Sequence, residues 1–423
     1  MVIGGCSCGL TAHPRLNGVL PNAKISRYTW RKKSQTALSL ELQNEMRMKQ
    51  RTYTRRDVVK GGAAALLGAS LALPLISRRA GTPWYLTRGV SVGIYPSGNG
   101  PLYGDFAELD AYINLAGGVV PKLVSVFSAW IPEGSTTYLY PHTDDLNLFY
   151  NRYPGSVLVW TWEPFGATLQ QIKSGAHDAY IDEVARRIGA VGKLVLIRFA
   201  HEMNLRWMSW PWLNQPPADY IAAWKRIVSR FRNLGATNAE WVWAPHIIAD
   251  SADDFSPWYP GDAYVDWTGL DGYNWGSVEN VWYTFHEIFQ NSIGVITALS
   301  PRGIIITETG CHSRGPHNES KGYWYSQMAA ELKQNYPQLQ GLINSHMIDQ
   351  RDGEDAEWRV DMPITSLDDW QNLVTDPQFR VPLGQPTTAL ADNTAPKVTA
   401  VGRTTARRES TLPPTSAPPS PRR

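Results

Sequence analysis

The chain has 423 residues, with 40 Lys and Arg against 38 Asp and Glu, so its formal net charge at pH 7 is +2. The basic residues gather at both ends, because residues 1–80 carry 14 basic and 3 acidic groups and residues 397–423 carry 6 and 1. The remaining stretch has 20 basic and 34 acidic groups, and this negative balance argues against a nucleic-acid partner. The length fits two or three domains or one large α/β barrel.

Aromatic residues are unusually frequent, with 18 Trp and 19 Tyr. Seventeen of the tryptophans lie between Trp84 and Trp370. This density indicates a large core together with an aromatic surface on which a ligand can stack, and sugars are one common ligand for such surfaces.

The N-terminal region contains an export motif. Residues 1–45 read as a doubtful or disordered leader, and residues 46–80 as a twin-arginine signal segment with Met46 or Met48 as a plausible start. Arg55-Arg56 precedes an apolar run at 61–76, which is short for a membrane span. We therefore expect export to the periplasm, cell surface or medium and no stable span, with an uncleaved anchor as the alternative.

Residues 84–385 alternate between apolar runs and segments of helical periodicity. The predicted strands are Gly89–Tyr95, Leu123–Trp130, Ser156–Trp162, Lys193–Ala200, Glu240–Ala244, Trp267–Asp271, Gly303–Thr307 and Gly341–Ile348. The predicted helices are Asp105–Leu115, Ala176–Ile188, Pro217–Leu234, Trp282–Leu299 and Lys321–Asn335.

Eight strands that alternate with helices predict a single (β/α)₈ TIM barrel of the α/β class. The alternative is an open doubly wound sheet, but residues 91–99 lack the Gly-x-Gly-x-x-Gly turn of its nucleotide-binding form. Residues 386–423 are rich in Pro, Thr, Ser and Arg and predict a disordered tail. Cys311 is the one cysteine after the leader, so no internal disulfide is expected.

Two predicted strands deliver a glutamate near their C-terminal ends. The run 196–204 leads to Glu202, and the run 303–310 leads to Glu308. Strands four and seven face each other across a barrel mouth, where barrel enzymes place catalytic residues. A retaining glycosidase needs two such carboxyls about 5–5.5 Å apart, one as nucleophile and one as acid and then base. The alternative is that both glutamates form salt bridges.

Three motifs in order along residues 88–360 resemble family 26 of the glycoside hydrolases, the β-mannanase family. His201-Glu202-Met203-Asn204, with Trp207 and Trp210 after it, resembles the acid/base strand. The segment 271–275, Asp-Gly-Tyr-Asn-Trp, is similar to the sixth strand, and 307–310, Thr-Glu-Thr-Gly, to the nucleophile strand.

The resemblance implies roles for five residues. Glu202 would be the general acid/base and Glu308 the nucleophile, while Tyr273 would hold the nucleophile carboxylate. His201 would bond the sugar at the −1 position or place the acid, and Trp207 would border that sugar.

The other predicted substrate contacts come from the ends of neighbouring strands. Each has a structural alternative, such as core packing for Trp162. These candidates are Asn204, Trp162, Trp210, Trp275 and His246.

The resemblance implies β-1,4-mannan or galactomannan as substrate, with xylan and mixed-linkage β-glucan as known variations. Two positions depart from the family pattern: Leu205 stands where the family has Gly, and the eighth strand lacks the usual Trp platform, so His346 or Trp358 is expected to replace it. We expect an endo-acting monomeric enzyme that needs no metal or cofactor. An alternative of the same family is a glycosidase that trims the cell's own exopolysaccharide.

Two rival classes remain open. A metal-dependent barrel hydrolase would draw on His201, His246, His312 and His346, but position 205 is Leu, so the His-Glu-x-x-His zinc motif is incomplete. A catalytically silent polysaccharide-binding barrel would share the fold and lack turnover.

Overall fold

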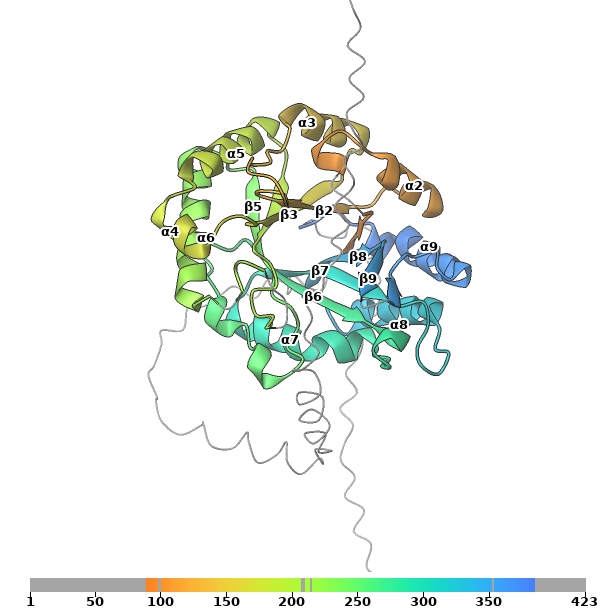
Figure 1. The fold of residues 1–423 in the computed structure, drawn as a ribbon. Coiled ribbons are helices and arrows are strands. Elements are labelled where there is room, and N and C mark those ends of the chain that lie inside the picture. The colour runs from red at the N-terminus through yellow and green to blue at the C-terminus, as the bar shows by residue number, and fades with distance from the viewer. Residues whose placement is uncertain (1–88, 98–99, 207–209, 214, 352–353, 385–423) are drawn as a thin grey trace, which may run out of the picture. The chain divides into compact units, whose positions relative to one another are not determined.

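The computed structural model describes residues 89–97, 100–206, 210–213, 215–351 and 354–384. Eight parallel strands close into a barrel in sequence order, and the helices surround it (Figure 1), which confirms the predicted (β/α)₈ fold. The predicted leader, twin-arginine segment and tail lie outside the described residues. The strands are β1 (Ser91–Tyr95), β2 (Leu123–Ala129), β3 (Val157–Glu163), β4 (Val195–Phe199), β5 (Ala239–Trp243), β6 (Trp267–Asn274), β7 (Gly303–Cys311) and β8 (Leu339–Ser345).

Among the described residues, the outer layer contains the five predicted helices and three more that the periodicity did not reveal. The predicted five are α2 (Ala107–Leu115), α5 (Asp178–Val191), α6 (Pro217–Asn233), α7 (Phe285–Leu299) and α8 (Lys321–Gln334). The other three are α3 (Thr143–Arg152), α4 (Leu169–Ser174) and α9 (Leu367–Thr375). None of the described helices is both long and apolar enough to cross a bilayer.

The predicted eighth strand runs too far. β8 ends at Ser345, and the chain turns into a hairpin of β9 (Ile348–Arg351) and β10 (Glu354–Glu357). Short 3₁₀ helices occur at Gly100–Leu102, Ser251–Asp253, Ser256–Trp258, Gly276–Val278, Ile364–Ser366 and Pro377–Phe379.

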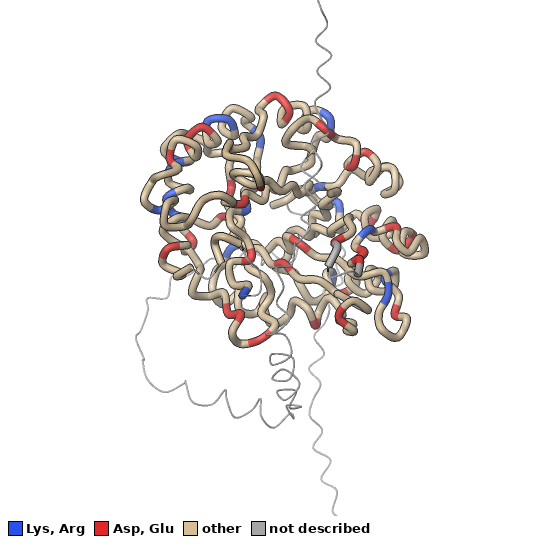
Figure 2. The backbone as a smooth tube through the Cα atoms, viewed as in Figure 1, with Lys and Arg blue, Asp and Glu red and all other residues tan. Residues whose placement is uncertain are grey.

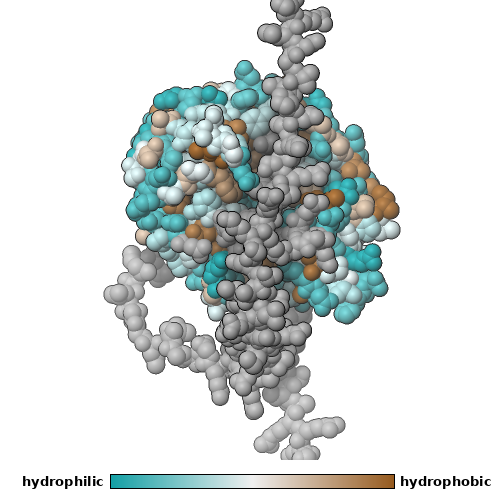
Figure 3. Space-filling model, in the orientation of Figure 1, coloured by the Kyte–Doolittle hydropathy of each residue, from teal (hydrophilic) through white to brown (hydrophobic). Residues whose placement is uncertain are grey.

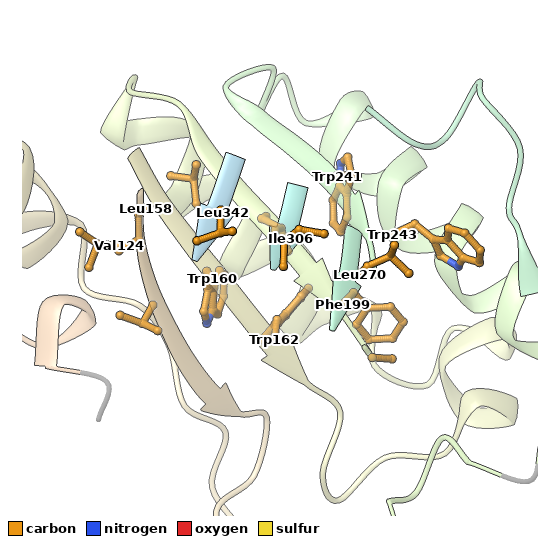
Figure 4. Packing of buried hydrophobic residues seen from close by; sticks show 14 of the residues in the cluster. Val124, Leu158, Trp160, Trp162, Phe199, Trp241, Trp243, Leu270, Ile306 and Leu342 are labelled. Carbon is orange, nitrogen blue, oxygen red and sulfur yellow. The ribbon is translucent and has the colours of Figure 1, made fainter. Parts of the chain in front are cut away.

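Two hydrophobic clusters form the core. The larger lies between strands and helices, where Leu158, Trp160 and Trp162 pack with Phe199 (Figure 4). The smaller cluster lies inside the barrel, and its members are Leu123, Val159, Leu196, Val242, Ala244, Ile305 and Ile343. Strand side chains alternate between the two faces, so β2, β3, β4, β5, β7 and β8 contribute residues to both clusters.

The same alternation places β3 side chains. Trp160 and Trp162 face the helices, whereas Val159 lies in the interior cluster and Thr161 contacts an interior arginine, Arg198. Glu163, the last residue of β3, therefore faces the interior at the C-terminal end. Counting every second residue along β3 therefore assigns the two Trp side chains to the helix side and not to the barrel mouth.

A β-bulge in β7 re-aims the predicted nucleophile. Leu270 of β6 pairs with Ile306, but the next residue of β6, Asp271, pairs with Glu308, so Thr307 has no opposite residue. Strict alternation would turn Glu308 toward the helices if Thr307 faced inward. The extra residue lets both side chains reach interior groups, as bulges near active sites do.

Charged residues of both signs are spread around the ring of helices, and some lie toward its centre (Figure 2). The described surface in Figure 3 is mostly hydrophilic with small hydrophobic patches. The ionisable groups near the centre are therefore the distinctive polar feature of this fold.

Candidate active site

Glu308 lies inside the barrel mouth with three polar neighbours. Arg198 Nη2 donates to its Oε1, and the Tyr273 hydroxyl donates to its Oε2 at 2.8 Å. His201 Nε2 lies 3.9 Å from Oε1. The carboxylate is 14% exposed, so it is fixed in orientation and still reaches the surface of the mouth.

Arg198 connects Glu308 to a buried layer beneath it. Its Nη1 donates to both oxygens of Asp271, at 2.8 and 2.7 Å, and its Nε donates to Thr161 Oγ1 at 2.9 Å. The Thr307 hydroxyl donates to Asp271 Oδ1 at 2.6 Å. Because Arg198 and Asp271 are fully buried, this charged layer fixes the floor of the site.

Opposing effects set the charge of Glu308. Burial raises the pKa of this carboxyl, and the negative charge of Glu202 adds to the rise. The Arg198 charge and the hydrogen bonds from Arg198 and Tyr273 lower the same pKa. The influence of Glu202 on Glu308 indicates that the two carboxyls share one site.

Glu202 follows β4 and bonds to the end of β5. Its Oε1 lies 3.0 Å from His246 Nδ1, and its backbone N–H donates to the Ala244 carbonyl at 2.8 Å. Its φ is +50°, and Ala200 has φ +45°, a region that non-glycine residues rarely adopt. Such backbone persists where the surrounding contacts hold it, often at functional sites.

Asn204 supplies part of that restraint and corrects one prediction. Its amide donates to the carbonyls of His246 and Asp253 at 2.9 and 2.8 Å, and its Oδ1 accepts from the His246 N–H at 2.9 Å. The side chain is 3% exposed and its hydrogen bonds go to backbone. Asn204 is therefore a positioning residue that fixes His246 beside Glu202, and the structure does not make it a sugar contact.

His201 lies between the Glu308 carboxylate and two aromatic rings. Its ring centroid is 4.7 Å from that of Trp210 and 5.9 Å from that of Phe127. Burial, the Arg198 charge and His246 lower its pKa well below the usual range, so the imidazole is neutral. Its Nδ1 is buried without a hydrogen-bond partner among the described residues, which leaves Nε2 as the atom that faces Glu308.

The three tryptophans Trp162, Trp207 and Trp210, predicted as sugar contacts, have different outcomes in the structure. Trp162 is a correction: it is fully buried in the helix-side core, where its Nε1 donates to the Tyr180 hydroxyl at 3.0 Å. Trp207 lies outside the described residues. Trp210 is partly exposed, and its ring stacks at 5.2 Å on buried Trp212, whose Nε1 donates to the His201 carbonyl at 2.8 Å.

Among the residues that the structure describes, the end of β8 carries no exposed aromatic platform. His346 accepts the Val360 N–H at 3.1 Å on Nδ1 and is 8% exposed, so it ties a loop in place. Trp358 is 2% exposed, with its ring 4.7 Å from Tyr273 and 5.0 Å from Trp275. Trp275 is half-buried and remains a predicted sugar contact.

The described part of the chain has no group of three His, Cys, Asp or Glu placed to hold a metal ion. Of the histidines that a metallohydrolase would use, His246 bonds Glu202, and His312 lies 3.1 Å from the Arg314 carbonyl through Nδ1. His246 thus contacts a carboxylate, and His312 contacts a backbone carbonyl.

Arg198 and Ser345 are site residues that the motifs did not indicate. Ser345 Oγ lies 2.8 Å from the Tyr273 hydroxyl. A single arginine inside an otherwise apolar strand, Val195–Phe199, was the available signal for Arg198. A charged residue there needs a buried counter-ion, and Asp271 at the end of another strand supplies it.

Replacement of Arg198 by Met is expected to lower the free energy of unfolding by about 3–5 kcal/mol, because Asp271 and Glu308 lose their cation. Arg206→Met is the matched control, since the exposed Arg206 side chain pairs with Asp250 and Asp253, and an ion pair of an exposed cation contributes at most about 1 kcal/mol. Chemical denaturation of both variants measures the difference. Equal losses in the two variants would contradict the buried network.

The chain is similar to glycoside hydrolases in the comparisons with known proteins. Residues 161–340 match the model described as glycosyl hydrolase family 26. Endoglucanase H of Acetivibrio thermocellus is 30% identical over 255 residues, 58% of this chain and 26% of the relative. A mannan endo-1,4-β-mannosidase of Bacillus subtilis is 30% identical over 154 residues, 34% of this chain and 37% of the relative. This chain therefore spans well under half the length of either relative.

The fold comparison agrees. The structure of a family 26 β-mannanase from Bacteroides ovatus superposes with a TM-score of 0.51 at 16% identity. The match covers 73% of this chain and 95% of that one. It shows a shared barrel.

Proposed function

We propose, from the premise that the barrel belongs to glycosyl hydrolase family 26, that this protein is an endo-acting glycosidase that cleaves a β-linked polysaccharide with retention. One observation carries the proposal: two carboxyls at one mouth have different partners. Glu308 receives hydrogen bonds from a cation and a phenol, whereas Glu202 has a histidine as its partner. A nucleophile and an acid/base need such a division of surroundings.

Each partner suits one step. Glu308, ionised and held by Arg198 and Tyr273, attacks the anomeric carbon while Glu202 gives its proton to the leaving oxygen. A water then loses its proton to Glu202 and attacks the glycosyl-enzyme, which releases Glu308 as the carboxylate. The neutral imidazole of His201 supplies a hydrogen-bonding Nε2 beside the nucleophile without adding charge.

The proposed substrate is a β-1,4-linked polysaccharide, with mannan or galactomannan first. The Bacillus mannosidase supports this choice. A β-glucan is the second candidate, because the relative matched over the longer stretch is an endoglucanase. Xylan is the third candidate, because it is a known substrate variation in the family that the motifs resemble.

The full chain should therefore release oligosaccharides from one of four polymers: β-1,4-mannan, galactomannan, mixed-linkage β-glucan or xylan. Chromatography of the products identifies both the polymer and endo cleavage, because endo attack gives a mixture of lengths from the start. Release from glucan or xylan alone would move the specificity and keep the mechanism. Binding of a polymer without any product would favour the silent binding barrel.

Tyr273→Phe is expected to lower kcat/KM by about 10- to 100-fold, because a hydrogen bond to a charged group is lost. The Tyr273 hydroxyl lowers the pKa of Glu308, so its removal raises that pKa and moves the acidic limb of the pH profile to higher pH. Ser345→Ala is the control, since it removes the other partner of the Tyr273 hydroxyl and leaves Glu308 untouched. An acidic limb that stays in place would argue against Glu308 as the ionised group.

We also propose export by the twin-arginine route, on the strength of Arg55-Arg56 before the apolar run at 61–76. Replacement of both arginines by Lys should retain the protein in the cytoplasm, which fractionation and immunoblotting measure. Unchanged export of the double variant would contradict the route.

A further inference from the structure

Glu163 is a third carboxyl that faces the barrel mouth. It is the last residue of β3 and lies two residues after Thr161, so both side chains face the interior of the barrel. The Thr161 hydroxyl contacts Arg198, and Glu163 pairs with Ala129 of β2. The Glu163 carbonyl accepts the Trp130 N–H at 2.7 Å, which fixes the backbone. The residue is only 8% exposed. Among the described residues, its carboxyl has no hydrogen-bond or ion-pair partner.

The positive charge near Glu163 is already engaged. Arg198 is the cation that acts on it, and all three guanidinium nitrogens of Arg198 donate to other groups, among them Asp271 and Glu308. The carboxylates of Glu308 and Glu202 also act on Glu163, and both oppose its ionisation. A further buried anion would therefore lack a counter-ion, which is costly.

We propose that Glu163 binds the substrate as a neutral carboxylic acid and donates its O–H to an oxygen of the sugar beside the scissile bond. This inference rests on the proposed glycosidase function and adds a specificity-determining residue to it. A neutral carboxyl both donates and accepts, so it can recognise a sugar hydroxyl without repelling the ionised nucleophile. The carboxyl would thereby complete its own hydrogen bonding, which the free protein leaves open.

The charge state has a pH consequence. Burial raises the pKa of Glu163 to about 8, with Arg198 opposing the rise and Glu308 and Glu202 adding to it. The donor is therefore present below about pH 8 and is lost as the pH rises through that value. We expect affinity for the sugar to fall over the same range.

The test measures binding of mannan, glucan and xylan tetrasaccharides with sulfur-linked, hydrolysis-resistant glycosidic bonds, by calorimetry at about pH 6 and about pH 9, which bracket the titration. In the wild type, affinity for the cognate tetrasaccharide should fall about tenfold or more between the two. Glu163→Ala should bind about 10- to 100-fold more weakly at the lower pH. Glu163→Gln, whose amide also donates, should recover most of that loss and lose the pH dependence.

Glu108→Gln is the matched control, because Glu108 is exposed on α2. Wild-type affinity in Glu163→Ala would overturn the contact, and a Gln variant as weak as Ala would show that the anion is required. A wild type that neither binds nor cleaves any of the polymers would instead defeat the proposed function.

Thermal unfolding of the full chain gives a readout that needs no sugar. The folded protein keeps the Glu163 proton where the unfolded chain loses it, so the wild type loses stability between about pH 4.5 and pH 8. The Tm of Glu163→Gln should therefore rise relative to the wild type across that interval. A constant difference in Tm would overturn the neutral state of Glu163.

Discussion

Glu308→Gln is expected to lower kcat/KM on the cognate polysaccharide by at least about 10⁴-fold, because an amide cannot form the glycosyl-enzyme. The Gln carbonyl oxygen can accept from Arg198, and its amide N–H can donate to the Tyr273 hydroxyl, so the site keeps its shape. Initial rates of reducing-sugar release measure the loss.

The comparison needs a check on the fold and on contamination. Glu108→Gln, prepared in the same way, should keep wild-type rates, because this glutamate lies on the exposed side of α2. The Tm of Glu308→Gln should stay near or above that of the wild type, since burial of the carboxylate raises its pKa. Activity above about one hundredth of the wild-type value would rule out Glu308 as the nucleophile.

Glu202→Ala is expected to reduce polysaccharide hydrolysis by about 10²- to 10⁴-fold, the usual contribution of a general acid/base. Its effect should depend on the leaving group, because a dinitrophenolate departs without a proton. With a dinitrophenyl glycoside of the cognate sugar, the first step should stay fast and the glycosyl-enzyme should accumulate as a burst.

Azide distinguishes this role from a structural one. A small anion can enter the space left by Glu202 and attack the glycosyl-enzyme without base assistance, so turnover should recover and a β-glycosyl azide should form. His246→Ala is the control, because it removes the partner of Glu202 but leaves the carboxyl in place. An equal loss on both substrates, with no response to azide, would contradict the acid/base role.

Local sequence patterns predict most of the barrel because the strands are strongly apolar. The sequence predicts all eight strands, whereas α4 has only 6 residues and is too short to show several turns of periodicity. β8 shows the limit at its C-terminal end: the apolar residues of 346–348 continue the strand pattern, but the chain turns into the hairpin that begins at Ile348. Only long-range contacts decide where such a strand ends.

The site was less predictable, for reasons of geometry. The motifs identified Glu202, Glu308 and Tyr273, and the structure brings them to one mouth. The alternation of side chains along β3 would have predicted Trp162 on the helix side, since Trp162 adjoins Glu163 and faces the opposite way.

The bulge in β7 could not be read from the sequence. Nothing in Thr307-Glu308 tells that an extra residue turns both side chains inward, because the pairing with β6 determines it. The motif therefore predicts a catalytic glutamate on this strand but does not predict which way its side chain points. The Arg198–Asp271 ion pair could not be predicted from local sequence either, since its residues lie 73 positions apart.

The central claim is that Glu202 and Glu308 hydrolyse a β-glycosidic bond in two steps, each with inversion. The most direct test is proton NMR of the first sugar released by the wild-type chain, recorded before mutarotation. The account predicts that the β-anomer appears first and that the α-anomer grows in later. An α-anomer as the first product would mean single-step inversion and would contradict a covalent role for Glu308.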